Sequence, residues 1–445
     1  MKEFTFKGGV HPKDRKERSR GKEITFQFPS TQTVTIPVTM GGAPNSPLVN
    51  VGDQVVKGQV IANGTGTISC PVHASITGKV KKISTHLVAG GAEALCITIE
   101  ENKENPDDRN KTAYMDPLDP FTCTRDEAIE RIHQSGITGM GGASFPTFVK
   151  FKYPADTKIE HLIINAAECE PYLTIDESLL AEKIDRILDG IRIVQHIVSA
   201  PAIIALEKNK AFLKDSIQKK IDSLTDLEYK IEVCIVKTKY PQGAEKNLIT
   251  ALTKKEVPSG ALPFTTGCII CNVGTVNAIS DAFRLGKPLI ERPLTISGDA
   301  CKTPMNIVVP IGTLVGDLIP QVVQLEDKVS KILHGGPMMG QSMQSADFPV
   351  QKGTSGVLFL TEEETGKSQP LPCIGCGRCI SVCPMQLEPV LMSRAVNCDD
   401  IPLALKKGLM DCIECGSCSF ICPSDVPLVQ IFKLGKKKFR DSKGR

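Results

Sequence analysis

Alternation of apolar and polar positions characterises the first hundred residues and predicts β-structure. Residues 24–28 (ITFQF) and 33–38 (TVTIPV) alternate in this way. Two half-motifs follow, at 49–62 and 70–83, in which β-branched residues alternate with polar ones and glycines stand at the turns. Such a pattern is typical of short strands joined by tight turns. We therefore expect a small β-barrel unit within residues 1–100.

The two half-motifs together resemble the barrel-sandwich of biotinyl and lipoyl carrier domains. A carrier domain attaches its cofactor to a lysine on the hairpin between its halves, but the hairpin here is NGTGTIS, residues 63–69. Because a group carrier depends on that covalent handle, we expect a scaffold rather than a carrier. His73 has no ligand partner near it in the sequence and is interpreted as a structural histidine.

The periodicity changes after a polar linker at 101–112. Residues 125–136 have helical spacing, and an apolar strand is predicted at 161–167. Helical and strand patterns then alternate through 179–197, 200–208 and 230–238. This alternation is typical of an α/β layer with a mostly parallel sheet. We assign such a domain to residues 115–285.

Glycines and polar residues are concentrated at the positions where the predicted strands end and the predicted helices begin. The loop 136–151 contains several glycines, which allow backbone N–H groups to face a phosphate, although it lacks the third glycine of a dinucleotide fingerprint. Ligands bind outside the carboxyl ends of parallel strands. The candidate residues at predicted strand ends and helix starts are Asn165, Glu168, Glu170, Gly243, Glu245 and Asn272.

The C-terminal part contains the motif CxxCxxCxxxCP twice, and this spacing is typical of two 4Fe-4S clusters. The fourth cysteine of each run ligates the other cluster in such modules. The expected sets are Cys373, Cys376, Cys379 and Cys422 for one cluster, and Cys412, Cys415, Cys418 and Cys383 for the other. Zinc sites are the alternative, but they usually use pairs with longer spacers. Disulfides are disfavoured because no secretory signal opens the chain.

The segment between the two cysteine runs has apolar residues near helical spacing, so the ferredoxin-type domain, residues 365–430, is expected to be helical. The other cysteines, among them Cys268 and Cys271, are interpreted as structural. The basic segment 431–445 is predicted either to lie on anionic lipid or an acidic partner or to be a solvated, frayed terminus.

Composition excludes several classes of function. With 41% hydrophobic and 23% charged residues the chain is an ordinary globular protein, not a largely disordered one. A net charge of +3, scattered aromatics and no tryptophan argue against nucleic-acid binding. No run reaches the roughly 18 apolar residues that a membrane-spanning helix needs. This chain is therefore not expected to cross a bilayer or to carry an ion through one itself.

Four segments resemble, in order, the flavin and NADH site of the flavoprotein subunit of respiratory complex I. They are GMGGASFPT at 139–147, NAAECEP at 165–171, QGAEKNLI at 242–249 and CNVGTVNAI at 271–279. With the barrel before them and two cluster motifs after them, the whole chain resembles the C subunit of the Rnf complexes, membrane-bound oxidoreductases that exchange electrons between ferredoxin and NAD. FKGGVHP at 6–12 and HGGPMMG at 334–340 add to this resemblance. The related subunit of the sodium-pumping quinone reductase lacks the paired cysteine motifs.

The resemblance implies roles for individual residues. FMN would be lined by Gly139, Gly141, Gly142, Ala143, Phe145 and Lys150, and hydrogen-bonded by Asn165 and Asn272. Glu168 and Glu170 would face the NADH nucleotide, and Glu245 stands at the matching acidic position. The complex I family has an Asp at the position of Ala167, and a pair of Glu where this chain has Ala244 followed by Glu245. The resemblance therefore supports the flavin contacts more strongly than the nicotinamide contacts. Residues 286–345, with two strands, a turn and a short helix expected from Arg292 to Leu333, resemble the β-grasp domain that follows the flavin domain.

The implied function is a redox relay, in which FMN converts hydride chemistry into single-electron flow through two 4Fe-4S clusters. The partners would be membrane-embedded and ferredoxin-reacting subunits, and the expected location is peripheral, on the cytoplasmic face of the bacterial inner membrane. Two other hypotheses stay open: a diaphorase subunit of a soluble hydrogenase or formate dehydrogenase, and a non-enzymatic electron wire and docking scaffold without a flavin. The only residues that favour the scaffold hypothesis are Ala167 and Ala244, where the chain departs from the complex I pattern.

Overall fold

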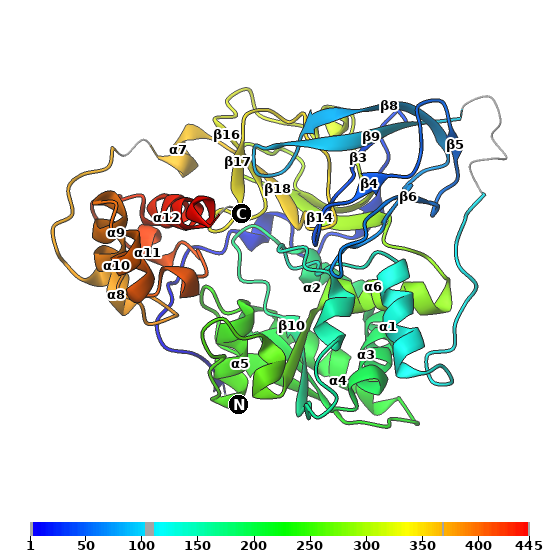
Figure 1. Ribbon diagram of the computed structural model, residues 1–445, viewed down its shortest axis with the longest axis horizontal. Helices are drawn as coiled ribbons and strands as arrows, with labels where there is room; N and C mark the ends of the chain where they lie inside the picture. Colours follow the sequence, from blue (N-terminus) through cyan, green and yellow to red (C-terminus); the bar gives the residue numbers. More distant parts are fainter. Residues whose placement is uncertain (1–2, 103–110, 367–368, 444–445) are drawn as a thin grey trace.

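The computed structural model describes residues 3–102, 111–366 and 369–443. Figure 1 shows a β-barrel unit and a second sheet above an α/β unit, with a helical unit at one side. The short 3-10 turns are Lys16–Arg18, Thr147–Phe151, Lys208–Leu213, Pro263–Thr266, Gly316–Leu318 and Leu409–Asp411.

The barrel unit consists of two small antiparallel sheets, ordered β3-β9-β8-β5 and β4-β6-β7. Its strands are β3 (Thr33–Pro37), β4 (Ser46–Pro47), β5 (Gln54–Val55), β6 (Val60–Asn63), β7 (Val72–His73), β8 (Gly78–Leu87) and β9 (Glu93–Glu101). Buried Ile36 and Ile97 belong to a hydrophobic core that continues without a break to Ile132 in the α/β unit. The barrel is therefore packed firmly onto its neighbour.

The α/β unit is built on a five-stranded parallel sheet, ordered β1-β12-β11-β10-β13. The strands are β1 (Glu3–Phe4), β10 (His161–Ala166), β11 (Ala202–Glu207), β12 (Ile231–Val236) and β13 (Cys268–Asn272). The helices are α1 (Arg125–Gln134), α2 (Ile175–Glu182), α3 (Ile184–Val198), α4 (Lys214–Asp222), α5 (Glu245–Thr253) and α6 (Val273–Arg284). The parallel sheet and the helix at 125–136 predicted from the sequence are both present.

Strand order reverses at β10, because β11 and β12 extend the sheet on one side of it whereas β13 joins on the other. In an open parallel sheet ligands bind outside the carboxyl ends of the strands at such a reversal, and we call this edge of the sheet the crevice. Helices α3 and α6 approach closely on one face, since a Cβ atom on Gly190 would lie 1.9 Å from the carbonyl oxygen of Val276.

The second large sheet has six strands, ordered β17-β16-β18-β14-β15-β2. They are β2 (Ile24–Phe26), β14 (Glu291–Ser297), β15 (Met305–Pro310), β16 (Lys331–His334), β17 (Gln341–Met343) and β18 (Gly356–Leu360). The two strands and short helix expected after Arg292 are present as β14, β15 and the turn at Gly316–Leu318. The sheet extends beyond the predicted range 286–345, because β2 pairs with β15 and β18 with β14.

The C-terminal unit is helical, as expected from the spacing between the cysteine runs. After α7 (Glu362–Thr365) it contains α8 (Arg378–Ser381), α9 (Pro389–Asn397), α10 (Ile401–Lys406), α11 (Ser417–Phe420) and α12 (Leu428–Ser442). The basic segment differs from the frayed terminus considered above, since most of it forms α12. Phe432 is fully buried, and Lys436 donates to the backbone oxygen of Cys412 and to Glu414. Apolar packing thus orders the inner side of this helix.

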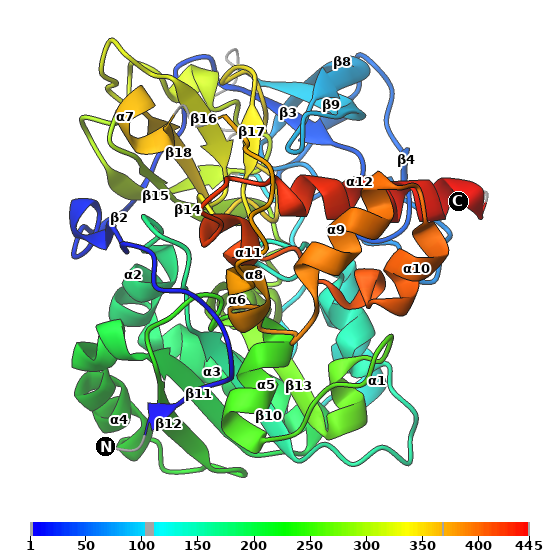
Figure 2. The same ribbon diagram turned by 90° about the vertical axis from the view of Figure 1, so that its left-hand side faces the viewer.

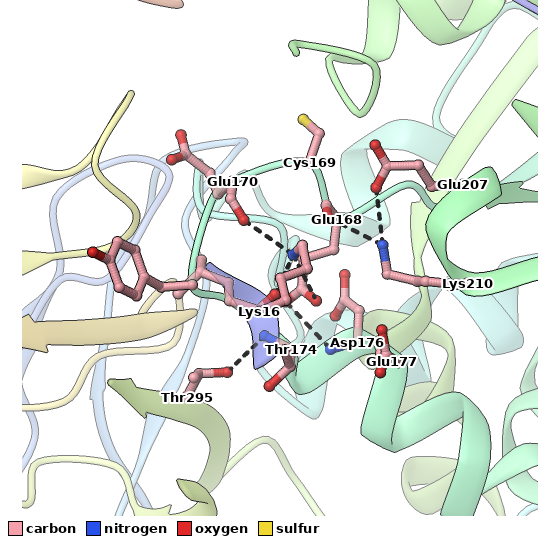
Figure 3. Close-up of polar contacts among 12 residues, drawn as sticks. Lys16, Glu168, Cys169, Glu170, Thr174, Asp176, Glu177, Glu207, Lys210 and Thr295 are labelled. Atoms are coloured by element: carbon pink, nitrogen blue, oxygen red, sulfur yellow. Dashed lines mark hydrogen bonds and ion pairs between the residues drawn. The ribbon is translucent and has the colours of Figure 1, made fainter. Parts of the chain in front are cut away.

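The N-terminal segment 3–26 connects three of these units, and we call it the strap. Its β1 joins the α/β sheet, its middle passes the helical unit, and its β2 joins the six-stranded sheet (Figure 2). Lys16 is 1% exposed and donates to the backbone oxygen of Leu173. It also donates to the backbone oxygen of Glu170 (Figure 3). The strap therefore places a buried cation beneath the segment that follows β10.

Replacing Lys16 should destabilise the protein strongly. Lys16→Met leaves the backbone oxygens of Glu170 and Leu173 without their buried donor, and each buried acceptor left unsatisfied costs ~1–3 kcal/mol. Urea unfolding of K16M measures the loss. K13M is the matched control because Lys13 is exposed on the same strap. Equal stability of the two variants would contradict this description of the strap.

Buried histidines should make the fold sensitive to acid. Burial, together with the positive charge of Lys352, lowers the pKa of His73 to about 3. Protonation below the ordinary value of 6.5 therefore favours the unfolded chain, and stability present near neutral pH is lost as pH falls. At about pH 5 the loss from His73 is about 2 kcal/mol. Between about pH 7.5 and pH 5, the free energy of unfolding of H73Q, measured in urea, should fall by about 2 kcal/mol less than that of wild type. H11Q is the control, since His11 is exposed, and its free energy of unfolding should fall as much as that of wild type.

Candidate functional site

The crevice at the strand reversal is bordered by two asparagines predicted from the sequence. Asn165 and Asn272 are direct register partners at the carboxyl ends of β10 and β13. Asn165 donates through Nδ2 to the backbone oxygen of Gly243 at 2.8 Å. Asn272 caps α6 by accepting from the N–H of Gly274, and its Nδ2 donates to Asp176 at 2.7 Å. The protein thus fixes both amides at the mouth of the crevice.

The glycine-rich loop lies next to these asparagines and is held from behind. The N–H of Gly139 donates to the backbone oxygen of Phe145 at 2.7 Å, which closes the loop. Met140 is anchored twice: its N–H donates to Thr275 Oγ1, and its carbonyl accepts from the guanidinium of Arg292 at 2.7 Å. Burial lowers the pKa of Arg292 to about 10, so this anchor remains a cation at neutral pH.

The front of the loop is open. Gly141, Gly142 and Ala143 are exposed. A Cβ atom built on Gly142 meets nothing within 4 Å, and one on Gly141 comes no closer than 3.8 Å to Asn272. At φ +112°, Gly142 has a backbone conformation that L side chains rarely adopt. An anchored loop with a bare backbone facing a crevice fits the close approach of a phosphate or a planar ring.

Lys150 and Glu245 form an ion pair at the start of α5. Lys150 Nζ lies 2.5 Å from Glu245 Oε1 and also donates to the backbone oxygen of Ile270 at 2.9 Å. The Glu245 side chain is 43% exposed, whereas that of Lys150 is 17% exposed. The carboxylate is therefore the more accessible member of this pair.

Glu168 lies in a buried network of charges beneath the crevice (Figure 3). Its Oε2 lies 3.9 Å from Lys16 Nζ, and its Oε1 accepts from the N–H of Asp176 at 3.3 Å. Lys210 donates to the backbone oxygen of Glu168 at 3.1 Å and to Glu207 at 3.0 Å. Burial raises the pKa of Glu168 to about 7, against the opposing effect of Lys16. Its Oε1 thus has a protein partner, whereas its buried Oε2 has no hydrogen-bond partner within the described residues.

Glu170 points to a different neighbour. Its two carboxylate oxygens accept from the backbone N–H groups of Met338 and Met339 at 3.0 and 2.9 Å. Figure 3 shows the Glu170 carboxylate directed away from the Lys16 ammonium. The alternating Glu168 and Glu170 of the NAAECEP segment are therefore separated: one lies under the crevice and the other binds the loop 336–340.

Each set of four cysteines predicted from the spacing lines a cavity of its own. Cys383, Cys412, Cys415 and Cys418 line one cavity together with Met392 and Phe432. Cys373, Cys376, Cys379 and Cys422 line the other, next to Val390 and Leu428. Within the described residues, no three His, Cys, Asp or Glu side chains are placed to hold a single metal ion. Four thiols around a mainly apolar cavity fit an iron-sulfur cluster, whose ligands are thiolates.

Several supporting residues were missed by the sequence analysis. Lys16, Asp176, Tyr240 and Arg292 all contact the segments of the site, but only folding brings them there. Lys16 lies in the basic stretch HPKDRKERSR, residues 11–20, which matches no motif, and Arg292 lies at the start of a strand that we expected in another domain. The FKGGVHP string, which belonged to the resemblance, is the one signal that pointed to the strap.

None of the helices in the described part of the chain has the length and apolar character needed to cross a bilayer. Three family models match the chain: an RnfC barrel sandwich hybrid domain over residues 4–104, a Nuo51 FMN-binding domain over 132–281, and a 4Fe-4S dicluster domain over 366–423. The chain therefore has the barrel-sandwich, FMN-binding and iron-sulfur domains that its motifs indicated.

Curated relatives cover most of the chain. One is the C subunit of the proton-translocating ferredoxin:NAD(+) oxidoreductase complex of Clostridium ljungdahlii, 40% identical over 87% of this chain and 84% of the relative. Another is the C subunit of the Na(+)-translocating ferredoxin:NAD(+) oxidoreductase complex of Acetobacterium woodii, 38% identical over 88% of this chain and 87% of the relative. Among solved structures, an air-oxidized NAD+-reducing [NiFe]-hydrogenase is 19% identical, with a TM-score of 0.49 over 71% of this chain and 54% of that chain.

The identity and coverage of these relatives, together with the matching barrel-sandwich domain, show that the chain belongs to the family of C subunits of the Rnf-type ion-translocating ferredoxin:NAD oxidoreductase complexes.

Proposed function

We propose that this chain is the peripheral electron-transfer subunit through which a membrane-bound complex exchanges electrons between NAD(H) and ferredoxin, coupled to ion movement. One observation carries the proposal. A single chain of this family combines a crevice that has the features of a flavin site with two cavities, each lined by four cysteines. When bound, FMN and the clusters convert two-electron hydride chemistry into single-electron flow.

The flavin would lie in the crevice at the strand reversal. The exposed backbone of Gly141, Gly142 and Ala143 would face it, with Gly139, Phe145 and Lys150 completing the lining. Asn165 and Asn272 would contact the ring from the strand ends, where the protein already holds their amides in place.

The nicotinamide nucleotide would approach from the open side, near Glu245. Of the three glutamates predicted for this region, Glu245 has the accessible carboxylate. Glu170 binds the loop 336–340 with both carboxylate oxygens, and Glu168 is buried beside Lys16, so we assign both to structural support rather than to the nucleotide. Asp176 has a related role, because it orients Asn272.

The two cysteine sets are proposed as the ligands of two 4Fe-4S clusters, with Cys422 and Cys383 exchanged between the two runs. The cavities support this exchange, since each contains three cysteines of one run and the last cysteine of the other. The six-stranded unit is proposed to be the β-grasp domain, with a packing and docking role. The partners would be membrane-embedded and ferredoxin-reacting subunits, on the cytoplasmic face of the bacterial inner membrane.

Filling the crevice should weaken flavin binding without unfolding the protein. In Gly141→Val the new side chain enters open space beside Asn272, where it occupies the position proposed for the flavin. We expect at least about tenfold weaker FMN binding, a loss of about 1.4 kcal/mol, with an unchanged melting temperature. Quenching of FMN fluorescence measures the affinity. The control is A113V, at an exposed position in another segment; FMN binding by G141V as tight as by this control would contradict the assigned site.

Removing one cysteine from either set should remove one cluster only. C376A and C415A are each expected to retain about half of the iron of reconstituted wild type, because each variant leaves the other set complete. C398A is the control, since Cys398 is an exposed cysteine that belongs to neither set. Iron and sulfide are assayed after anaerobic reconstitution. Full iron content in C376A or C415A would refute the corresponding ligand set.

A further inference from the structure

The two cysteine sets differ in their exposure. We call Cys383, Cys412, Cys415 and Cys418 the inner set, and Cys373, Cys376, Cys379 and Cys422 the outer set. In the inner set Cys415 and Cys418 are buried and the other two are partly buried, whereas in the outer set Cys373 and Cys376 are exposed. Exposed Leu371 and Ile374 accompany the outer set, at 63% and 71% exposure. One set thus lies against the rest of the protein and the other lies at its surface.

Tyr240 joins the inner set directly to the α/β unit. It lies between β12 and α5, is 1% exposed, and donates through its hydroxyl to the backbone oxygen of Cys415 at 2.7 Å. Tyr240, Cys415 and Val10 form a small apolar core on which Cys169 also packs. The Cys169 sulfur accepts from the N–H of Gly243, whose carbonyl accepts from Asn165. Packed and hydrogen-bonded groups therefore run from the flavin crevice to the inner set.

Glu170 secures the same junction through the loop 336–340. Its carboxylate binds the N–H groups of Met338 and Met339 and lies 3.4 Å from the Tyr240 hydroxyl. The loop is pressed against the inner set, because a Cβ atom on Gly416 would lie 2.9 Å from the carbonyl oxygen of Met338. The six-stranded unit, the α/β unit and the inner set thus meet at the Glu170 carboxylate and the Tyr240 hydroxyl.

The strap holds the remaining side of the inner set. The N–H of Gly9 donates to the backbone oxygen of Val382 at 2.8 Å, and Val10 exchanges two backbone hydrogen bonds with Tyr240. A Cβ atom on Gly8 would lie 2.7 Å from the carbonyl oxygen of Cys383. The loop of the outer set, by contrast, is bonded within its own unit, from the N–H of Leu371 to the carbonyl oxygen of Ser424.

We propose that Tyr240 and Glu170 are positioning residues that hold the inner cysteine set against the flavin crevice, so that electrons pass between the flavin and the outer set through the inner set. The inference rests on the ligand sets and the flavin site proposed above. Its physical basis is that electron transfer depends on the placement of the redox centres, and that hydrogen bonding and exposure near the cluster sulfurs set the cluster's potential. The outer set, at the surface, is then the end that meets the redox partner.

The positioning role is tested with Tyr240→Phe and Glu170→Gln in the anaerobically reconstituted holoprotein. Y240F removes the hydrogen bond to Cys415, and E170Q removes one of the two acceptors for the Met338 and Met339 N–H groups. In EPR-monitored redox titrations, both variants should shift the midpoint potential of one cluster and leave the other unchanged. The shifted cluster should be the one that survives in C376A. Y153F is the matched control, since Tyr153 packs against Arg125 in another part of the α/β unit.

Stopped-flow reduction by NADH provides a second readout for the same variants. Flavin reduction should proceed at the wild-type rate, and bleaching of the clusters should be at least threefold slower. Unchanged potentials and bleaching rates in both variants would overturn the positioning role. Slowed flavin reduction in E170Q would instead place Glu170 at the nucleotide and overturn its assignment to the junction.

The order of the clusters is tested with the two cysteine variants, each loaded with FMN and its remaining cluster. In C376A, NADH should still reduce the inner cluster rapidly. In C415A, dithionite should reduce the outer cluster, but reduction by NADH should be at least tenfold slower than in wild type. Rapid reduction by NADH in C415A would overturn the order while leaving the proposed function intact. Absence of FMN binding or of clusters in wild type would refute the proposed function itself.

Discussion

The burial of the Lys16 ammonium beneath the segment that follows β10 is the interaction on which the site depends. A charge removed from water is tolerated only where fixed dipoles and opposite charges replace its hydration, and Lys16 obtains these from backbone oxygens of residues 170 and 173 and from Glu168. Glu168 in turn accepts from the N–H of Asp176, and Asp176 orients Asn272 at the crevice. A chain of contacts thus links a residue of the strap to an asparagine more than 250 positions away in the sequence.

The same strap explains how units of different fold form one relay. Its ends complete two different sheets, and its middle bonds to the loop that carries Cys383. The six-stranded sheet contributes Arg292 to the glycine-rich loop and the 336–340 loop to the inner cysteine set. The barrel, which lacks a carrier lysine, shares a continuous core with the α/β unit. These units therefore act as supports that fix the distance between crevice and cysteines.

Sequence reasoning predicted the parts of the molecule whose signal is local. The cysteine spacing predicted two sets, and each set lines its own cavity in the structure. Asn165 and Asn272 were placed at strand ends, and the parallel register brings them together. Helical spacing predicted the helix that begins at Arg125, and a capping box in which Thr124 and Glu127 satisfy each other's backbone fixes its start.

What the sequence could not reveal depends on contacts between distant segments. In NAAECEP the two glutamates are equivalent by pattern, yet Glu168 faces Lys16 whereas Glu170 faces the 336–340 loop, because their partners come from opposite ends of the chain. For the basic last residues both a surface for anionic lipid or an acidic partner and a solvated, frayed terminus were left open; in the structure Phe432 on the same helix supplies the burial that orders most of the segment. Tyr240 had no distinguishing pattern, since its role arises only when the helical unit docks.

The most direct test of the account is an anaerobic titration of the cluster-reconstituted protein with FMN and then with NADH, following flavin and iron-sulfur absorbance together. We predict that one FMN binds per chain and that NADH bleaches both chromophores, the flavin first. Formation of both clusters without any FMN binding or any response to NADH would contradict it, and would leave the chain as an electron wire without a nicotinamide site.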